Sequence, residues 1–421
     1  MRRTRPVLLG LLAAVLAAGS LAAPAGAVSG TPVTEIPDPP AQPAGESAYA
    51  FTARLDIGDG TRACSGTLVE SQWLLTAASC FAEDPAVSLD VPAGAPRWKT
   101  TATVGRADLT GSAGAVRDVV ELVPHPGRDL VLARLASRIT DVTPVAPASS
   151  APVAGEELRV TGYGRTADAW APLVLHAGDF TTETVGATEV GITGQEGAAV
   201  CAGDAGGPVL RETAQGAELV AVSSRSAQGG CFGTDESVTS TGAFGTRLDD
   251  ITSWIGVHVA RWALKSNVNG KYVSTELNAT GDQTGKLRAR SDTKYGWEQF
   301  TLHTRDGGTT VALRSEANGL YVSVEKNMTG DHTGMLRART EAPYSWEMFT
   351  LVPQGSLGYA LKSELTGKYV TVEANFTGQD EGLLRARSDS VAGWERFSLT
   401  HADNYRVVGA DPAAPAPLPL G

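Results

Sequence analysis

The sequence is poor in the residues that bind metal ions. It contains 4 cysteines and 6 histidines in 421 residues, and no two cysteines have the Cys-x-x-Cys spacing of a zinc site. We therefore expect no metal ion and no cofactor. After residue 27 no run approaches the ~20 apolar residues that a membrane-spanning helix needs, so we expect no membrane span.

Basic residues are also in the minority. Lysine and arginine total 35 against 46 aspartates and glutamates, which gives a formal net charge of −11. Residues 28–257 carry 14 basic and 28 acidic residues, a net charge of −14, whereas residues 258–407 carry 18 and 17, a net charge of +1. Neither part has the basic surface of a nucleic-acid-binding protein, so no nucleic-acid partner is expected.

Aromatic residues make up only 6% of the chain and charged residues 19%, whereas there are 48 glycines. This balance favours short strands joined by turns over long helices. A chain of 421 residues is too long for one hydrophobic core, since domains run to roughly 100–200 residues. We therefore expect two or three structural units.

The first 27 residues have the pattern of a secretory signal peptide. Arg2, Arg3 and Arg5 precede an almost unbroken apolar stretch over residues 7–23, and Ala25-Gly26-Ala27 offers the small residues of a cleavage site. A single membrane anchor is the alternative, but the apolar stretch is short and rich in small residues. We therefore expect a secreted, extracellular protein, with a proline-rich leader over residues 28–47.

An exported protein can form disulfide bonds, and the four cysteines fall into two local pairs. The members of the pairs are 16 and 30 residues apart, and three connectivities are possible on paper. Two local structural bridges are the expected outcome, joining Cys64 to Cys80 and Cys201 to Cys231.

Residues 258–403 contain the same pattern three times. The tyrosines of a Gly-x-Tyr-Val element and the tryptophans of a Trp-Glu-x-Phe element both step by 49 and then 48 residues: Tyr272, Tyr321 and Tyr369, and Trp297, Trp346 and Trp394. A fixed period of this length marks a repeat architecture. Each repeat predicts about four short strands, which in the first repeat are Trp262–Ser266, Lys271–Thr275, Lys286–Arg290 and Phe300–His303.

Three such units predict a closed β-trefoil. An open solenoid would need atypical capping repeats, and a propeller usually needs at least about four blades. Residues 404–421 are rich in proline and alanine and predict a disordered tail.

Three segments of residues 48–257 resemble the trypsin-like serine proteases. Thr76-Ala-Ala-Ser79-Cys80 resembles the block that carries the general base of that family, which ends Thr-Ala-Ala-His-Cys. Arg128-Asp129-Leu130 resembles the strand of the triad aspartate, and Gly203-Asp204-Ala205-Gly206-Gly207-Pro208 resembles the nucleophile loop, Gly-Asp-Ser-Gly-Gly-Pro. The resemblance implies an all-β fold class: a trypsin-like double six-stranded β-barrel followed by the C-terminal three-repeat β-trefoil. Both cysteine pairs stand where the family has bridges.

The resemblance also implies a degenerate catalytic triad. Asp129 keeps the carboxylate and the Gly203 N–H keeps part of the oxyanion site, but Ser79 stands at the base position and Ala205 at the nucleophile position. A serine hydroxyl cannot serve as the base near neutral pH, and a methyl group cannot attack a carbonyl. Ala199 falls where trypsin has the acid at the bottom of its specificity pocket. We therefore expect a catalytically inactive homologue.

Two further residues leave alternatives open. His125 lies four residues before Asp129 and is a candidate for a substitute base, although the family often has a surface His-Pro at this point. Asp204 is the residue that, in active relatives, pairs with the new amino terminus. Removal of the signal would expose Val28, whose amine could pair with Asp204; otherwise Asp204 bonds to local backbone donors.

The three repeats resemble the fascin-like members of the β-trefoil group, on the Gly-x-Tyr-Val and Trp-Glu-x-Phe elements. Trefoils outside cells suggest a carbohydrate or surface ligand, which is an analogy from the fold alone. The repeated tyrosines are core residues or sugar contacts. The arginines of each Leu-Arg-Ala-Arg element bind a ligand, or pair with the nearby Glu298, Glu347 and Glu395; these arginines are Arg288, Arg290, Arg337, Arg339, Arg385 and Arg387.

Three functional hypotheses remain. The first is a secreted binding protein built on an inactive protease domain, with a polysaccharide, cell-surface or peptide ligand. The second is a serine endopeptidase with a rearranged site. The third is a carbohydrate-binding protein in which the protease fold is a scaffold.

Overall fold

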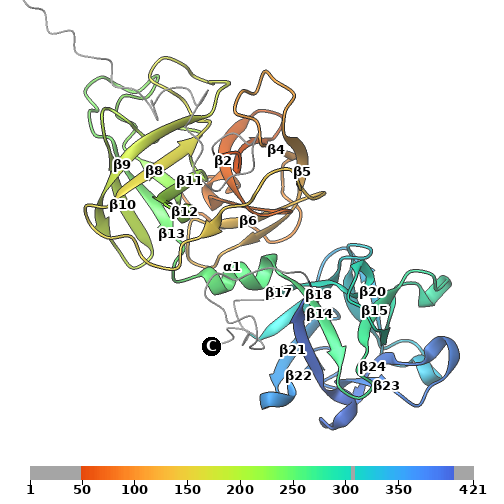
Figure 1. The fold of residues 1–421 in the computed structure, drawn as a ribbon. Helices are drawn as coiled ribbons and strands as arrows, with labels where there is room; N and C mark the ends of the chain where they lie inside the picture. The colour runs from red at the N-terminus through yellow and green to blue at the C-terminus, as the bar shows by residue number, and fades with distance from the viewer. Residues whose placement is uncertain (1–48, 305–308, 403–421) are drawn as a thin grey trace, which may run out of the picture.

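The computed structural model describes residues 49–304 and 309–402, which form an all-β structure of three barrels (Figure 1). The predicted signal peptide, leader and tail lie outside the described residues. The only α-helix of the described part, α1 (Thr252–Val259), follows the first two barrels and precedes the third. The predicted fold class is confirmed.

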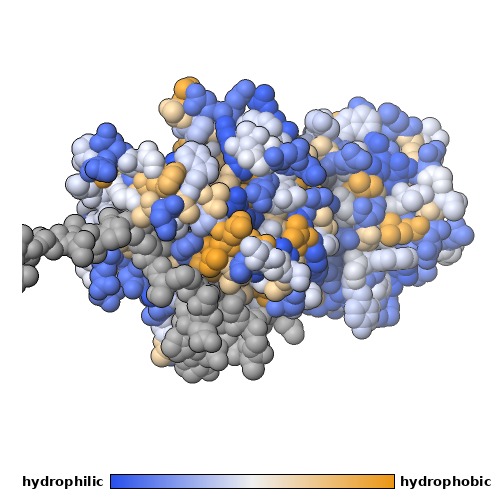
Figure 2. Space-filling model, turned by 90° about the horizontal axis from the view of Figure 1, so that it is seen from above, coloured by the Kyte–Doolittle hydropathy of each residue, from blue (hydrophilic) through white to orange (hydrophobic). Residues whose placement is uncertain are grey.

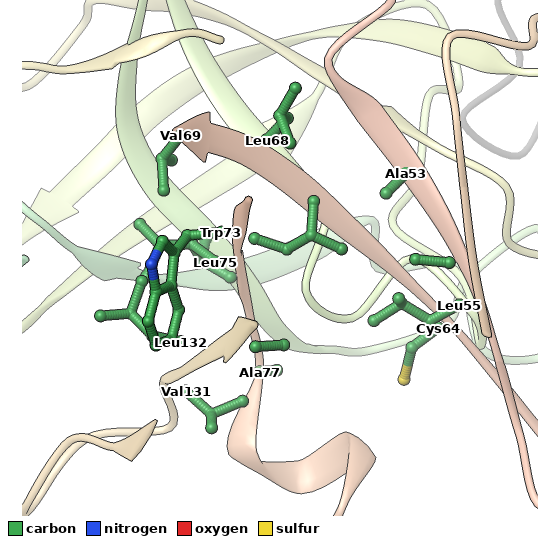
Figure 3. Close-up of a cluster of buried hydrophobic side chains, with 14 of the residues drawn as sticks. Ala53, Leu55, Cys64, Leu68, Val69, Trp73, Leu75, Ala77, Val131 and Leu132 are labelled. Atoms are coloured by element: carbon green, nitrogen blue, oxygen red, sulfur yellow. The ribbon is translucent and has the colours of Figure 1, made fainter. Parts of the chain in front are cut away.

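The first barrel is closed by six antiparallel strands in the order β1-β2-β3-β6-β5-β4. Its interior is filled by apolar side chains that alternate along the strands, among them Leu55, Leu68 and Leu75, all fully buried (Figure 3). The six strands are β1 (Thr52–Ile57), β2 (Arg62–Glu70), β3 (Trp73–Thr76), β4 (Thr100–Val104), β5 (Ala115–Pro124) and β6 (Val131–Leu135).

The second barrel is closed by the pairing of β11 with β12, and the short β7 pairs with β12 in parallel. Its core contains Leu158, Val160 and Phe180. The strands are β7 (Ala146–Pro147), β8 (Glu157–Gly162), β9 (His176–Val185), β10 (Glu189–Gly194), β11 (Pro208–Thr213), β12 (Gly216–Ser226) and β13 (Gly242–Arg247).

The third unit contains four strands from each sequence repeat. The first and fourth strands of the three repeats pair into a closed ring, β14-β17-β18-β21-β22-β25. The second and third strands form three hairpins, which meet through pairings among β16, β20 and β24. The strands are β14 (Arg261–Ser266), β15 (Tyr272–Glu276), β16 (Lys286–Ser291), β17 (Phe300–Thr304), β18 (Thr310–Ser315), β19 (Tyr321–Glu325), β20 (Met335–Thr340), β21 (Met348–Pro353), β22 (Tyr359–Ser363), β23 (Tyr369–Glu373), β24 (Leu383–Ser388) and β25 (Phe397–His401).

The sequence period explains this threefold arrangement. Phe300, Phe349 and Phe397 occupy equivalent positions of the Trp-Glu-x-Phe element, and all three are fully buried in one core. A single repeat cannot bury such a residue by itself, so the three repeats stabilise one another around a shared core. The four strands predicted for the first repeat coincide with β14–β17 to within about one residue at each end.

A buried polar cluster joins the first barrel to the C-terminal unit. Glu121 on β5 is 6% exposed; its Oε2 lies 2.6 Å from Nε of Arg134, and its Oε1 accepts a 2.6 Å hydrogen bond from the hydroxyl of Tyr321. Nδ1 of His303 lies 3.1 Å from the same Oε1. Burial by itself raises the pKa of Glu121, but His303, Arg134 and Tyr321 outweigh it and hold that pKa well below its usual range.

On the face shown in Figure 2, hydrophobic residues form small separate patches within a mostly hydrophilic surface. Within residues 49–304 and 309–402, no helix is long and apolar enough to cross a membrane.

Both predicted disulfide bonds are confirmed, Cys64–Cys80 and Cys201–Cys231.

Candidate functional site

Ser79 and Asp129 meet where the first two barrels face each other. Ser79 lies in a single 3-10 turn, Ala78–Cys80, directly after β3, and Asp129 lies just before β6. The backbone N–H of Ser79 donates to Oδ1 of Asp129 over 2.7 Å, and the Ser79 hydroxyl donates to Oδ2 over 3.1 Å. The residue at the base position therefore keeps contact with the carboxylate, but it presents a hydroxyl in place of an imidazole.

Asp129 is held in place from the second barrel. Ser224 on β12 donates its hydroxyl to Oδ2 over 2.6 Å, and Thr246 on β13 donates its hydroxyl to the Asp129 carbonyl oxygen over 3.1 Å. Asp129 is only 9% exposed, so these bonds replace most of the water that an ionised carboxylate needs. Two hydroxyls and one backbone N–H thus hold the carboxylate.

Ala205 lies in the turn before β11, beside the disulfide of the first barrel. Its carbonyl oxygen accepts a 3.0 Å hydrogen bond from the N–H of Ser65 and lies 3.6 Å from Sγ of Cys80. Gly203, two residues earlier, has a φ of +101°, a conformation that suits glycine. The turn that the sequence predicts to be the nucleophile loop is therefore held against the first barrel, and its residue 205 carries only a methyl group.

Gly206 shows how tightly this turn is packed. Its φ is +88°, and a Cβ added there would lie 2.0 Å from Oγ1 of Thr76 and 2.2 Å from the carbonyl oxygen of Ser65. We expect Gly206→Ala to lower the free energy of unfolding by about 2–4 kcal/mol, because left-handed strain and overpacking add. Urea unfolding of the full chain measures this loss.

Gly127 provides the matched control for Gly206. Its φ is +83°, but a Cβ at this position meets nothing within 4 Å. Gly127→Ala should therefore cost only the backbone strain, about 1 kcal/mol. Equal losses in the two variants would contradict the packing of the turn described above.

Asp204 is a fully buried carboxylate that is held by backbone donors. The N–H of Gly164 donates to its Oδ1 over 2.7 Å, and the N–H of Cys201 donates to its Oδ2 over 2.9 Å. Burial raises the pKa of Asp204 to about 7, and the two hydrogen bonds only partly oppose this shift. Of the two alternatives drawn from the sequence, local backbone donors are those present in the structure; Val28 lies outside the described residues.

The raised pKa of Asp204 predicts a pH effect on stability. The unfolded side chain loses its proton near pH 4 and the folded one near pH 7, so the folded protein binds more protons between these values. Stability should therefore fall as the pH rises from about 4 to about 7, by about 1.4 kcal/mol for each unit of the pKa difference. In urea unfolding, wild-type protein should lose more stability between pH 5 and pH 8 than Asp204→Asn.

A flat difference for Asp204 would have another meaning. If the wild-type protein and Asp204→Asn changed equally in stability between pH 5 and pH 8, the pKa of the folded carboxylate would not be raised. Pairing with the Val28 amine, the other partner considered from the sequence, would produce that result, because a cation keeps the carboxylate ionised over this whole range.

The walls of the expected specificity pocket are joined to each other. Ser226 donates its hydroxyl to the carbonyl oxygen of Val200 over 2.5 Å. The side-chain amide of Gln228 donates to the same carbonyl over 3.3 Å and to the Ser226 hydroxyl over 2.5 Å, and its Oε1 accepts from the N–H of Ala202 over 2.8 Å. Ala199, at the predicted pocket bottom, is 1% exposed. A substrate side chain would have to break this network to enter.

A cavity of about 960 Å³ lies beside Asp129, which forms part of its wall. It is lined by Ser79, Asp129 and Ser224, by the loop of residues 85–93, and by Trp254 and His258 of α1. Its walls combine apolar side chains such as Leu89 and Val91 with a few charged ones, as is usual for ligand pockets.

His125 lines this cavity but does not take the place of the missing base. Its ring packs edge-on against Trp254, with ring centres 4.8 Å apart, and its buried Nδ1 has no hydrogen-bond partner among the described residues. Burial and then the charge of Arg128 lower the pKa of His125. No hydrogen bond in the described part of the chain connects this imidazole to Asp129.

The arginines of the three repeats make structural contacts, and one predicted pairing is wrong. Glu298, Glu347 and Glu395 accept hydrogen bonds from Ser274, Ser323 and Thr371 and from backbone N–H groups of their own turns. The second arginine of each Leu-Arg-Ala-Arg element pairs with a glutamate of the preceding strand instead: Arg290 with Glu276, Arg339 with Glu325 and Arg387 with Glu373. This pairing depends on which residues lie next to each other on paired strands, and the separation of two residues in the sequence does not show that.

The first arginine of each element connects neighbouring repeats. Nε of Arg288 donates to the carbonyl oxygen of Glu381 over 2.8 Å, and Nε of Arg385 donates to that of Thr333 over 3.0 Å. Arg337 bonds to the carbonyl oxygen of Asp282. All three acceptors lie in or directly beside a 3-10 turn of another repeat: the second repeat bonds to the first, the third to the second and the first to the third. These arginines therefore hold the hairpins together.

The repeated tyrosines have unequal surroundings. Tyr321 is 3% exposed and bonds to Glu121 of the first barrel, whereas Tyr272 and Tyr369 are half-buried beneath Lys265 and Lys362. The exposed aromatic residues of this unit are others, which the sequence analysis missed: Tyr295 is 74% exposed and Tyr344 70% exposed. Each lies two residues before the tryptophan of the Trp-Glu-x-Phe element, a spacing visible in the sequence.

Three residues that shape the cleft were also missed. Ser224 lies on β12, and no motif marks its hydroxyl as a partner of Asp129. Ser226 and Gln228 carry no motif, and only the folded chain brings them against Val200. Among the described residues, no group of three or more histidines, cysteines, aspartates or glutamates is placed to hold a metal ion.

Comparisons with known proteins agree with the geometry of the first two barrels. Residues 41–255 match the family described as Trypsin. Trypsin II-P29 of Gallus gallus is 26% identical over 190 residues, which covers 38% of this chain and 70% of that protein.

Proposed function

Because the chain belongs to the trypsin family, we propose that it is a secreted family member in which proton transfer and nucleophilic attack have both been lost. It hydrolyses no peptide, and its protease domain, residues 48–257, serves to bind. The observation that carries this proposal is the contact between Ser79 and Asp129. The carboxylate accepts a hydrogen bond from a hydroxyl and not from an imidazole, and residue 205 is an alanine.

The absence of a general base and of a nucleophile should determine the rate of peptide hydrolysis. Removal of the base or the nucleophile alone typically costs about 10⁴–10⁶ in rate, and removal of both costs little more. The retained Gly203 N–H could stabilise an oxyanion only after an attack has occurred, and no described side chain is placed to attack. The hydrogen bonds of Gln228 to Val200 and Ala202 support the same conclusion, because a substrate side chain would have to enter between these residues.

Hydrolysis assays test this proposal. Purified full-length protein should show no turnover of casein or of a small ester above the level of an Asp129→Ala variant, since the variant lacks the last member of the triad. Ser65→Ala and His125→Ala serve as controls for contaminating proteases, because neither should change the signal. Turnover that survives both controls but vanishes in Asp129→Ala would establish the alternative, an endopeptidase with a rearranged site.

A second function is favoured for residues 258–403, which we propose to be a fascin-like β-trefoil that binds carbohydrate. The exposed rings of Tyr295 and Tyr344 support it, because an exposed aromatic ring offers an apolar face with a polar edge. A glycan array with the full chain should detect a polysaccharide ligand, and the Tyr295→Ala/Tyr344→Ala double variant should lose the signal. Tyr272→Ala is the matched control. Silence on the array would count against this function.

A further inference from the structure

The cavity beside Asp129 is lined by Ser79, the residue that the resemblance places at the position of the base. Ser79, Asp129 and Ser224 all line it. A serine side chain has one heavy atom beyond Cβ, whereas a histidine has five, so the substitution leaves room for a planar five-membered ring. The backbone N–H of Ser79 still binds Oδ1 of Asp129 over 2.7 Å, so the carboxylate lies where an imidazole would meet it.

The charges around the cavity favour a cation. Arg128 forms a two-point ion pair with Asp250, and Arg225 forms one with Glu189, so each of these arginines is neutralised by its own carboxylate. Burial lowers the pKa of both lining histidines, His125 and His258, which leaves them uncharged at neutral pH.

Asp129 is the buried charge that remains. It forms no salt bridge with any residue of the described ranges, although the charge of Arg225 acts on it from a distance. A carboxylate offers about four acceptor positions, and Asp129 uses three of them. Oδ1 receives only the backbone N–H, so it can accept one more hydrogen bond.

We propose that this cavity binds a small ligand that carries a planar N–H cation, an imidazolium or a close relative, in the space of the missing imidazole. The ring donates to Oδ1 of Asp129, and the body of the ligand lies against Leu89, Val91, Val123 and Trp254. The volume of about 960 Å³ is near the upper end of ligand pockets, which run from roughly 300 to 1,000 Å³, so the ring is only one part of the ligand. This proposal rests on the proposed function only in that position 79 carries no imidazole.

The experiment uses the full chain and 4-methylimidazole, which has the shape of the missing side chain. Titration followed by NMR or calorimetry near pH 7 should show saturable binding at one site. 4-Methylthiazole has a similar shape but no N–H donor, and it should bind at least about tenfold more weakly, since the carboxylate would be left without a donor.

Two variants locate the site. Ser79→His fills the space with a tethered imidazole, so it should weaken binding of 4-methylimidazole at least tenfold. Asp129→Asn removes the acceptor charge and should weaken it by a similar factor. Asp331→Asn removes an exposed carboxylate in the C-terminal unit and should leave the affinity within twofold of the wild-type value.

The proposal would be overturned by an absence of saturable binding, by equal binding of the thiazole, or by unchanged affinity in Ser79→His. If Asp129→Asn fails to fold, Ser79→His still decides the matter. Hydrolytic turnover would overturn the proposed function without affecting this titration, so the two failures are distinguishable.

Discussion

The double variant Ser79→His/Ala205→Ser should react covalently with a fluorophosphonate probe at least about 10⁴ times faster than either single variant. The frame that such chemistry needs is present. Residue 79 bonds to Asp129 through its backbone N–H, which a substitution leaves intact, and Ser224 and Thr246 fix the carboxylate from the other barrel. A restored imidazole could then bridge Asp129 and the new hydroxyl. Intact-mass measurement over time gives the labelling rate.

Amide hydrolysis by the same double variant should remain undetectable. The probe needs only the nucleophile and the base, whereas a peptide also needs a pocket for its side chain. We expect the bonds of Gln228 and Ser226 to Val200 to close that pocket. Adding Gln228→Gly should therefore raise peptide hydrolysis, with Gln195→Gly as the control. Labelling no faster than in the single variants would contradict the preserved frame, and efficient peptide hydrolysis without Gln228→Gly would contradict the closed pocket.

The substitution Glu121→Ala should lower the free energy of unfolding by about 3–5 kcal/mol, because it leaves Arg134 buried without its carboxylate partner. It also removes the acceptor of Tyr321 and the partner of His303, so the two units should lose their connection. Urea unfolding measures the loss, and small-angle scattering should show a larger radius of gyration.

The surface pair of Asp389 with Lys368 provides the comparison, since the Asp389 side chain is 85% exposed. Asp389→Ala should leave the unfolding midpoint unchanged, because exposed ion pairs add little. If Glu121→Ala were as stable as Asp389→Ala and equally compact, the buried cluster would not hold the units together.

The third barrel was predictable from the sequence, because the same pattern of strands recurs after 49 and then 48 residues. The core faces of β14–β17 therefore repeat in the next two segments. The assignment of Ser79 and Ala205 to the triad positions rests on motifs that differ from the family pattern by one residue each, and it stays a prediction.

Contacts between distant segments could not be predicted in the same way. Glu121 follows the alternation of β5 and gives no sign that its partners, His303 and Tyr321, lie about 200 residues further along the chain. The pairing of Arg290 with Glu276 in place of Glu298 depends on strand register, which side-chain spacing alone does not specify. Gln228 has a φ of +66° and lies in a turn that no sequence motif predicts. Its position in the expected pocket could therefore not be predicted either.

The central claim is that this chain has no nucleophile, and fluorophosphonate labelling of the unmodified protein tests it most directly. The full chain should show no mass increase in the time in which an active trypsin is labelled completely. Stoichiometric labelling that maps by mass spectrometry to one residue of this chain, and that is lost in Asp129→Ala, would contradict the claim.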